Sequence, residues 1–293
     1  MLDEQVKTGK GSVRIRRQPS PNGEPTVLIH GLGASGHNWF PFISHMSDQL
    51  DMTAPDLPGF GQSLPPSDQD HSPKNFAEIM AEVIEKTYPG QSVHLLGNSL
   101  GGAIAVQLAA RHPKLVKSMT LVSPALPTLY PDLSAAPVVL SALPKFGEKL
   151  MQRYFELPPA ERASNTIQNT FADRRNAPEN WHEAITRELA ERDLQPHQLS
   201  SLLATLRSLL ATFFDRSEQA PWNLVKSISA PSLFMYGGKD KLVHPRAAKK
   251  VPYFAPMAQV RVLAETGHVA HIEHTAWVAE EFSENHLRNR IAY

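Results

Sequence analysis

Short apolar runs in the first 122 residues alternate with segments whose apolar side chains recur every three or four positions. The runs predict buried strands, since a parallel sheet is covered on both faces. The recurring pattern predicts helices with one apolar face. We therefore expect an α/β fold with a mainly parallel sheet. The predicted strands cover 13–17, 26–30, 51–54, 93–97 and 116–122, and the predicted helices cover 75–88 and about 100–112.

From about residue 124 to 215 the pattern contains no run that predicts a strand. Proline-broken helical pieces are predicted there over 143–157, 160–171 and 198–214. Afterwards the alternation returns, with strands over 232–236 and 259–263 and helices over 245–251 and 271–287. We therefore expect a core formed by 1–123 and 216–293, with a helical cap (lid) inserted over 124–215.

Composition narrows the possible functions. The chain of 293 residues has a formal net charge of zero, so nothing indicates nucleic acid or an anionic membrane surface as a partner. The absence of cysteine excludes disulfides, a thiolate nucleophile and a cysteine-ligated zinc. The polar first ten residues lack a signal-peptide core, and no apolar run approaches the ~20 residues that span a bilayer. We expect no integral membrane segment and a cytoplasmic location.

The basic cluster Arg14, Arg16 and Arg17 is interpreted as a solvated strand face.

The most informative motif is Gly97-Asn98-Ser99-Leu100-Gly101, which follows a predicted strand and precedes a predicted helix. It fits the G-x-S-x-G pattern, in which a sharp turn raises the serine hydroxyl above the sheet. The turn predicts a strained backbone at Ser99. The adjacent helix start offers free N–H groups and a positive dipole end for a developing oxyanion.

A serine needs a base, and the base needs a carboxylate that fixes its tautomer. Asp240 follows the strand predicted over 232–236, and His268 follows the strand predicted over 259–263. Both therefore belong to the carboxyl edge of the sheet, where open α/β sheets place their sites. The order Ser99, Asp240, His268 predicts a catalytic triad of nucleophile, acid and base.

The segment His30-Gly31-Leu32-Gly33 follows another strand and supplies a second chemical element. In serine acyl transfer the oxyanion is bound by the N–H after the nucleophile and by one from an earlier strand–helix loop. We expect these donors to be the backbone N–H groups of Leu100 and Leu32. His30 and Gly31 are expected to orient the loop without transferring protons.

Two alternative interpretations, a dinucleotide site and a metal site, involve residues of these motifs. The segment 31–36 also matches G-x-G-x-x-G, with Asp56 at the ~20-residue distance of a ribose-binding acid. That dinucleotide interpretation needs a helix through Pro41 and leaves the serine motif unexplained. His268, His271 and His274 could suggest a metal site, but no zinc-protease signature accompanies them. We expect neither a metal nor a cofactor.

Together these motifs resemble the α/β-hydrolase superfamily, in its serine carboxylesterase and lipase-like branch with a helical cap. The resemblance implies a cap over Ser99 and a structural role for Asp56. Haloalkane dehalogenases and epoxide hydrolases carry aspartate at the position of Ser99, so this chain is unlike them. The matching segments are 30–33, 56–63, 97–102, 237–240 and 267–268.

The main hypothesis is a serine hydrolase acting on a small-molecule ester with an apolar acyl or aryl group, because the predicted cap is rich in leucine. The second is a C–C bond hydrolase of dienoate products of aromatic meta-cleavage, which often share Gly-Asn-Ser-x-Gly-Gly. Those enzymes usually carry tryptophan where Val269 follows His268. They also need a cationic contact from the cap. The third is a non-catalytic ligand-binding protein on a hydrolase scaffold.

Overall fold

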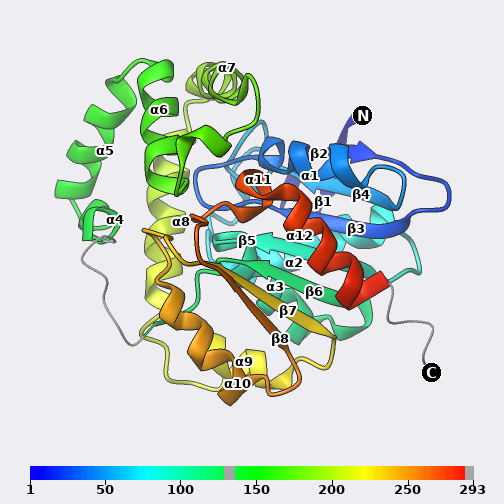
Figure 1. Ribbon diagram of the computed structural model, residues 1–293. Helices are drawn as coiled ribbons and strands as arrows, with labels where there is room; N and C mark the ends of the chain where they lie inside the picture. Colours follow the sequence, from blue (N-terminus) through cyan, green and yellow to red (C-terminus); the bar gives the residue numbers. More distant parts are fainter. Residues whose placement is uncertain (129–135, 288–293) are drawn as a thin grey trace.

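The computed structural model describes residues 1–128 and 136–287. Within these ranges a single eight-stranded sheet has the order β1-β2-β4-β3-β5-β6-β7-β8 (Figure 1). The strands from β4 to β8 in this order are parallel, whereas β2 pairs antiparallel with both β1 and β4. The predicted α/β class with a mainly parallel sheet is confirmed. The strands are β1 (Leu2–Thr8), β2 (Gly11–Gln18), β3 (Glu24–Ile29), β4 (Leu50–Pro55), β5 (Val93–Asn98), β6 (Val116–Val122), β7 (Ser232–Gly237) and β8 (Gln259–Leu263).

Strand β1 was not predicted, because its sequence is mostly polar and both faces are exposed or half-buried. Its backbone pairs with β2 from Leu2↔Arg17 to Thr8↔Gly11. Main-chain hydrogen bonds at a sheet edge need no apolar pattern, so hydrophobicity carries little signal for such a strand.

Helices cover both faces of the sheet (Figure 1). The predicted helix over 271–287 is instead broken at His274, whose φ of −137° and ψ of 54° are not helical. The remaining turn after α12 is a π-helix, Ser283–Leu287. The helices outside the segment between β6 and α9 are α1 (Phe40–Met46), α2 (Pro73–Thr87), α3 (Leu100–Arg111), α9 (Pro221–Ser227), α10 (Val251–Phe254), α11 (Ala270–Glu273) and α12 (Thr275–Phe282).

Between β6 and α9 the described residues form helices and connecting turns, with no strand among 136–215. We refer to α4–α8 as the insertion. Two of these helices, α4 and α7, were not predicted; α7 buries only Trp181 and Ile185, so its apolar periodicity is weak. No helix in 1–128 or 136–287 combines the length and apolarity needed to cross a membrane. The helices are α4 (Ala136–Ser141), α5 (Phe146–Glu156), α6 (Pro159–Thr170), α7 (Trp181–Asp193) and α8 (Gln198–Thr212).

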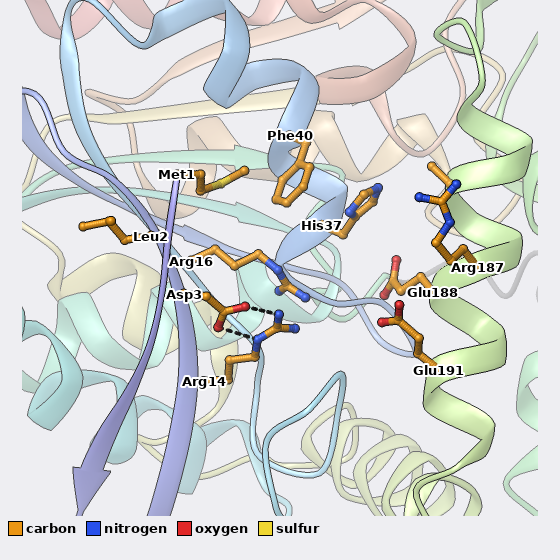
Figure 2. Close-up of a pocket in the computed structure, with 11 residues that line it drawn as sticks. Met1, Leu2, Asp3, Arg14, Arg16, His37, Phe40, Arg187, Glu188 and Glu191 are labelled. Atoms are coloured by element: carbon orange, nitrogen blue, oxygen red, sulfur yellow. Dashed lines mark hydrogen bonds and ion pairs between the residues drawn. The ribbon is translucent and has the colours of Figure 1, made fainter.

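An open groove of about 310 Å³ lies between the β1–β2 edge, the start of α1 and helix α7 (Figure 2). Two of its lining residues, Arg14 and Asp3, form an ion pair. The groove walls carry both signs of charge, and they include neither Ser99, Asp240 nor His268. Its lining residues are Met1, Leu2, Asp3, Arg14, Arg16, His37, Phe40, Ala184, Arg187, Glu188 and Glu191.

The expected solvated face of Arg14, Arg16 and Arg17 was wrong. Strand β2 lies inside the sheet, between β1 and β4, and Arg16 is only 8% exposed. Its guanidinium pairs with the fully buried Asp56. The sequence pattern predicts these cations on a solvent-exposed face. In the fold, neighbouring strands and loops supply carboxylates to them, since a buried charge requires a partner.

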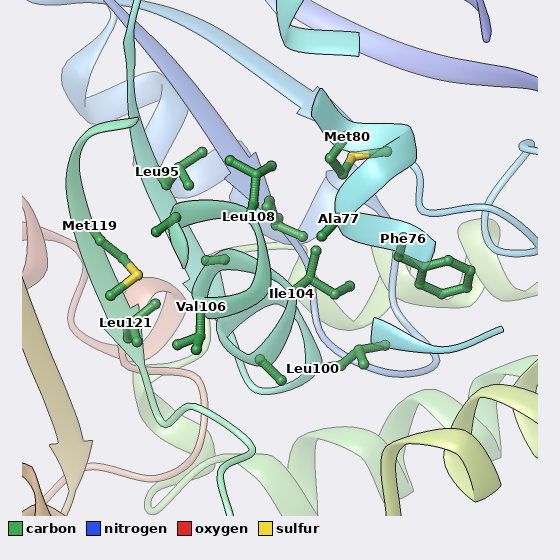
Figure 3. Packing of buried hydrophobic residues seen from close by; sticks show 14 of the residues in the cluster. Phe76, Ala77, Met80, Leu95, Leu100, Ile104, Val106, Leu108, Met119 and Leu121 are labelled. Carbon is green, nitrogen blue, oxygen red and sulfur yellow. The ribbon is translucent and has the colours of Figure 1, made fainter. Parts of the chain in front are cut away.

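The core is split by the sheet, because alternate side chains of each strand point to opposite faces. Val27 and Ile29 of β3 pack with α2 and α3, while Leu28 packs with α1 and α12. Helix α3 packs against α2 and against strands β5 and β6, with Leu100, Ile104 and Leu108 in the first cluster (Figure 3). This packing on the sheet fixes the start of α3, and therefore the position of the residue before it.

Candidate active site

Ser99 occupies the turn between β5 and α3 in a strained conformation, with φ 53° and ψ −115°. Left-handed backbone at a residue other than glycine costs about 1–3 kcal/mol and persists only where the surroundings enforce it. Here the Ser99 N–H donates to the Val122 carbonyl at 3.0 Å. A Cβ at Gly101 would lie 2.1 Å from the Ile29 carbonyl oxygen, so this position tolerates only glycine. The strain expected at Ser99 is present.

Asp240 and His268 come together from the loops after β7 and β8. His268 Nδ1 lies 2.9 Å from Asp240 Oδ2, and both residues are buried. The other carboxylate oxygen, Oδ1, accepts hydrogen bonds from the N–H groups of Leu242 and Val243 at 2.8 and 2.9 Å. Burial would raise the pKa of the Asp240 carboxyl, but His268 and the backbone donors hold that pKa below its usual value. An ionised Asp240 keeps the proton of the neutral imidazole on Nδ1 and leaves Nε2 as the acceptor.

Asn98 connects this pair to the serine turn. Its Nδ2 donates to the backbone carbonyls of His268 and Val122, each at 3.1 Å. The residue directly before Ser99 therefore holds the backbone of His268. The sequence carries no local signal for this role, since the hydrogen bond joins residues 170 positions apart.

The loop after β3 lies against Ser99. A Cβ at Gly31 would be 3.3 Å from the Ser99 Cβ, so the absence of a side chain allows this close approach. Leu32 follows Gly31, and Leu100 is the first residue of α3, where backbone N–H groups have no partner within the helix. The structure therefore places both predicted donor segments beside Ser99.

His30 is fully buried and holds this loop. Its Nδ1 donates to the Gly31 carbonyl at 2.7 Å, and its Nε2 accepts from the Leu57 N–H at 2.9 Å. Burial lowers the pKa of His30 to about 4, so the ring is neutral at pH 7 and keeps both hydrogen bonds. These contacts support the expected orienting role.

Asp56 has no free oxygen for a ribose. Its Oδ1 accepts from the Gly36 N–H at 2.9 Å and pairs with Arg16, and its Oδ2 accepts from the Gln62 N–H at 3.0 Å. The side chain is fully buried. The dinucleotide interpretation of segment 31–36 is therefore wrong, and Asp56 is a structural residue that joins β2 to two loops.

The three histidines from 268 to 274 do not converge. His271 is buried against the Trp39 ring at a centroid distance of 4.2 Å, while His268 faces Asp240. The Glu273 carboxylate binds backbone N–H groups of other segments. Across 1–128 and 136–287, no three His, Asp or Glu side chains are arranged as metal ligands.

The insertion contacts the site from two sides. The Arg192 Nη2 of α7 donates to the Gly33 carbonyl at 2.7 Å, and a Cβ at Gly33 would lie 3.4 Å from Leu202 of α8. On the opposite side, the His268 N–H donates to the Thr170 carbonyl at the end of α6, at 2.7 Å. The insertion therefore touches both the loop after β3 and the loop of His268.

Comparison with known proteins identifies the family whose sequence pattern this chain matches. The family model described as the alpha/beta hydrolase fold matches residues 24–275. Lipase 1 of Psychrobacter immobilis is 27% identical over 256 residues, covering 86% of this chain and 73% of the lipase. The 2-hydroxymuconate semialdehyde hydrolase of Pseudomonas sp. strain CF600 is 26% identical over 267 residues, covering 90% of this chain and 87% of that enzyme.

Among solved structures, the 2-hydroxy-6-oxo-6-phenylhexa-2,4-dienoate hydrolase of Rhodococcus sp. strain RHA1 superposes with a TM-score of 0.76. The superposition covers 97% of this chain and 98% of that one, at 20% sequence identity. At this identity the similarity concerns the fold alone, because related folds carry many different reactions.

Proposed function

The chain belongs to the α/β-hydrolase fold family, and on that premise we propose that it is a serine hydrolase of carboxylic esters. The observations that carry the proposal are the strained turn at Ser99, the buried His268–Asp240 pair, and the hydrogen bond from Asn98, directly before Ser99, to the His268 carbonyl. A nucleophile, a base and an ionised acid on one sheet edge are the groups that acyl transfer requires.

In the proposed reaction, Ser99 Oγ attacks the acyl carbon while His268 Nε2 takes the hydroxyl proton. The negative charge on the carbonyl oxygen is bound by the N–H groups of Leu32 and Leu100, each worth about 3 kcal/mol in such sites. His268 then protonates the departing alcohol, which leaves an ester of Ser99. Water, deprotonated by His268, attacks that ester. The acyl–Oγ bond breaks, the imidazolium returns its proton to Ser99 Oγ, and the acid is released. Asp240 stabilises the imidazolium in both steps.

We infer that the insertion is the cap of this site. Leu202 lies beside the Gly33 loop and α8 packs its apolar face inward, with Leu203, Leu206 and Leu209 buried. An apolar covering next to the oxyanion donors favours an apolar acyl or aryl group over a charged one. For this cap we keep the bounds 124–215 that the sequence pattern predicts.

The test compares wild type with Ser99→Ala on 4-nitrophenyl esters from acetate to palmitate. We expect wild-type turnover with a chain-length optimum, and a loss of about 10⁶ in kcat for the variant. Circular dichroism provides the folding control. Turnover by a folded Ser99→Ala protein within a factor of ten of wild type would refute the assignment.

A C–C bond hydrolase is a second candidate, favoured by the position of Arg192. Its guanidinium contacts the Gly33 carbonyl and lies 3.6 Å from Glu188, so a cation is present at the covering of the site. A dienoate substrate carries a carboxylate that such a cation would bind. Rapid bleaching of a ring-fission dienoate, with no ester turnover, would support this reaction over ester hydrolysis.

A further inference from the structure

Glu273 lies five residues after His268 and is 6% exposed. Its carboxylate is hydrogen-bonded to backbone N–H groups and not to the proposed catalytic side chains. Oε2 accepts a hydrogen bond from the Gly267 N–H at 2.7 Å. Oε1 accepts from the Asp173 N–H at 3.0 Å and the Ala172 N–H at 3.1 Å. One buried carboxylate is thus bound both by the peptide before His268 and by two peptides of the insertion.

The same two segments are in direct backbone contact. His268 donates its N–H to the Thr170 carbonyl at 2.7 Å. A Cβ at Gly267 would lie 2.4 Å from that carbonyl oxygen and 2.6 Å from the Ala172 nitrogen. The end of α6 therefore lies against the Gly267–His268 peptide with no room for a side chain between them.

Apolar packing surrounds these hydrogen bonds. Phe171, which follows the last residue of α6, belongs to one buried cluster with Val269 and Ile272. The cluster continues into the insertion through Ile167 and Trp181. Because Val269 and Ile272 flank the imidazole loop on one side, a displacement of α6 is transmitted to the residues next to His268.

We propose that Glu273 is a positioning residue that couples the insertion to His268. The proposal rests on the proposed function, since it assumes that His268 is the base of Ser99. Asp240 fixes the imidazole ring from one side. Glu273 fixes the backbone of the loop relative to the insertion, because its two oxygens bind both segments simultaneously. A carboxylate is suited to this role since it accepts several hydrogen bonds and donates none.

The test measures how fast an alkyl fluorophosphonate labels Ser99. The reaction forms the Oγ–P bond and breaks the P–F bond, with fluoride leaving and the hydroxyl proton passing to His268. In Glu273→Gln an amide NH₂ faces backbone N–H groups, so one segment is released. We expect labelling to be about 10- to 100-fold slower, the size of effect that a small misplacement of a catalytic group produces.

The matched control is Glu281→Gln, which removes the partner of Arg261 on α12 at 2.8 Å and touches neither the insertion nor the His268 loop. It should label at the wild-type rate. A second readout separates positioning from stability: on 4-nitrophenyl acetate, well below the unfolding temperature, Glu273→Gln should lower kcat with KM within about twofold of wild type, as expected for an interaction expressed in the transition state.

The outcomes are distinct. Wild type that is never labelled overturns both this proposal and the proposed function. Wild type that labels, with Glu273→Gln labelling equally fast, overturns the positioning role alone. If Glu273→Gln does not fold, Glu273→Asp keeps the charge but is too short to bind both segments. Slower labelling of that variant supports the coupling, and wild-type labelling contradicts it.

Discussion

Replacing Asp240 by asparagine tests the proposed triad with almost no change in shape. Asp240 Oδ1 accepts two backbone hydrogen bonds, from Leu242 and Val243. The asparagine oxygen is expected to keep that position, because an NH₂ group there would face two N–H donors. The amide nitrogen would then face His268 Nδ1, where the carboxylate Oδ2 lies in the wild type.

The magnitude follows from the tautomer. An amide N–H can only donate, so Nδ1 of His268 would become the acceptor and its proton would move to Nε2. Protonated Nε2 cannot take the proton of Ser99. The stabilising charge beside the imidazolium is lost as well. We expect kcat to fall by about 10⁴, which corresponds to about 5 kcal/mol of transition-state stabilisation.

The assay is kcat for a 4-nitrophenyl ester, with the unfolding temperature measured in parallel. Asp215→Asn is the control, since that aspartate accepts from the Ser217 N–H outside the site. It should retain wild-type activity. A folded Asp240→Asn protein with kcat within tenfold of wild type would refute the tautomer argument.

Three further predictions concern the scaffold. Gly101→Ala should destabilise the protein by about 3 kcal/mol in urea unfolding, because its Cβ would press on the Ile29 carbonyl, and a loss below 1 kcal/mol would contradict this. Asp56→Asn should lower the free energy of unfolding by about 3–5 kcal/mol at pH 7, since it leaves Arg16 unpaired. Burial raises the pKa of Asp56, but Arg16 and backbone donors hold that pKa below its usual value. The stability that the ionised Asp56 contributes is therefore fully present above pH ~4 and is lost as pH falls through the lowered pKa. A stability difference between wild type and Asp56→Asn that persists undiminished at pH 3 would be inconsistent with this. Burial lowers the pKa of His271 to about 3, so the unfolded chain binds more protons than the folded one as pH falls through ~6.5. Wild type should therefore lose about 1.6 kcal/mol more stability than His271→Phe between pH 6.5 and 5, and parallel pH profiles would count against this.

Much of the fold was predictable because the central strands and amphipathic helices carry strong local patterns. Strand β6 and strand β8 were predicted with the bounds that the structure has. The turn at Ser99 was predictable since its glycines and serine are adjacent in sequence. The roles of Ser99, Asp240 and His268 stay a prediction until activity is measured.

Other features had no local signal. The ion pair of Arg16 with Asp56 joins residues 40 positions apart. The local sequence around Arg16 therefore predicted a solvated face for a side chain that is buried. The bonds of Glu273 to 172 and 173 cross from α11 to the insertion. Such contacts depend on which elements the fold brings together, and periodicity describes only one element at a time.

The contact between α6 and the His268 loop also limits how this protein can be redesigned. Exchanging insertions between relatives is an obvious way to alter a pocket while keeping the sheet. Here the transplant boundary cannot follow the sheet edge, because the Thr170 carbonyl accepts from the His268 N–H and the Ala172 N–H donates to Glu273 of α11. A chimaera that retains Glu273 but receives a foreign α6 terminus would bind substrate in a reshaped pocket beside a displaced His268. Productive exchange requires the stretch 170–173 and Glu273 to be transferred as a matched pair.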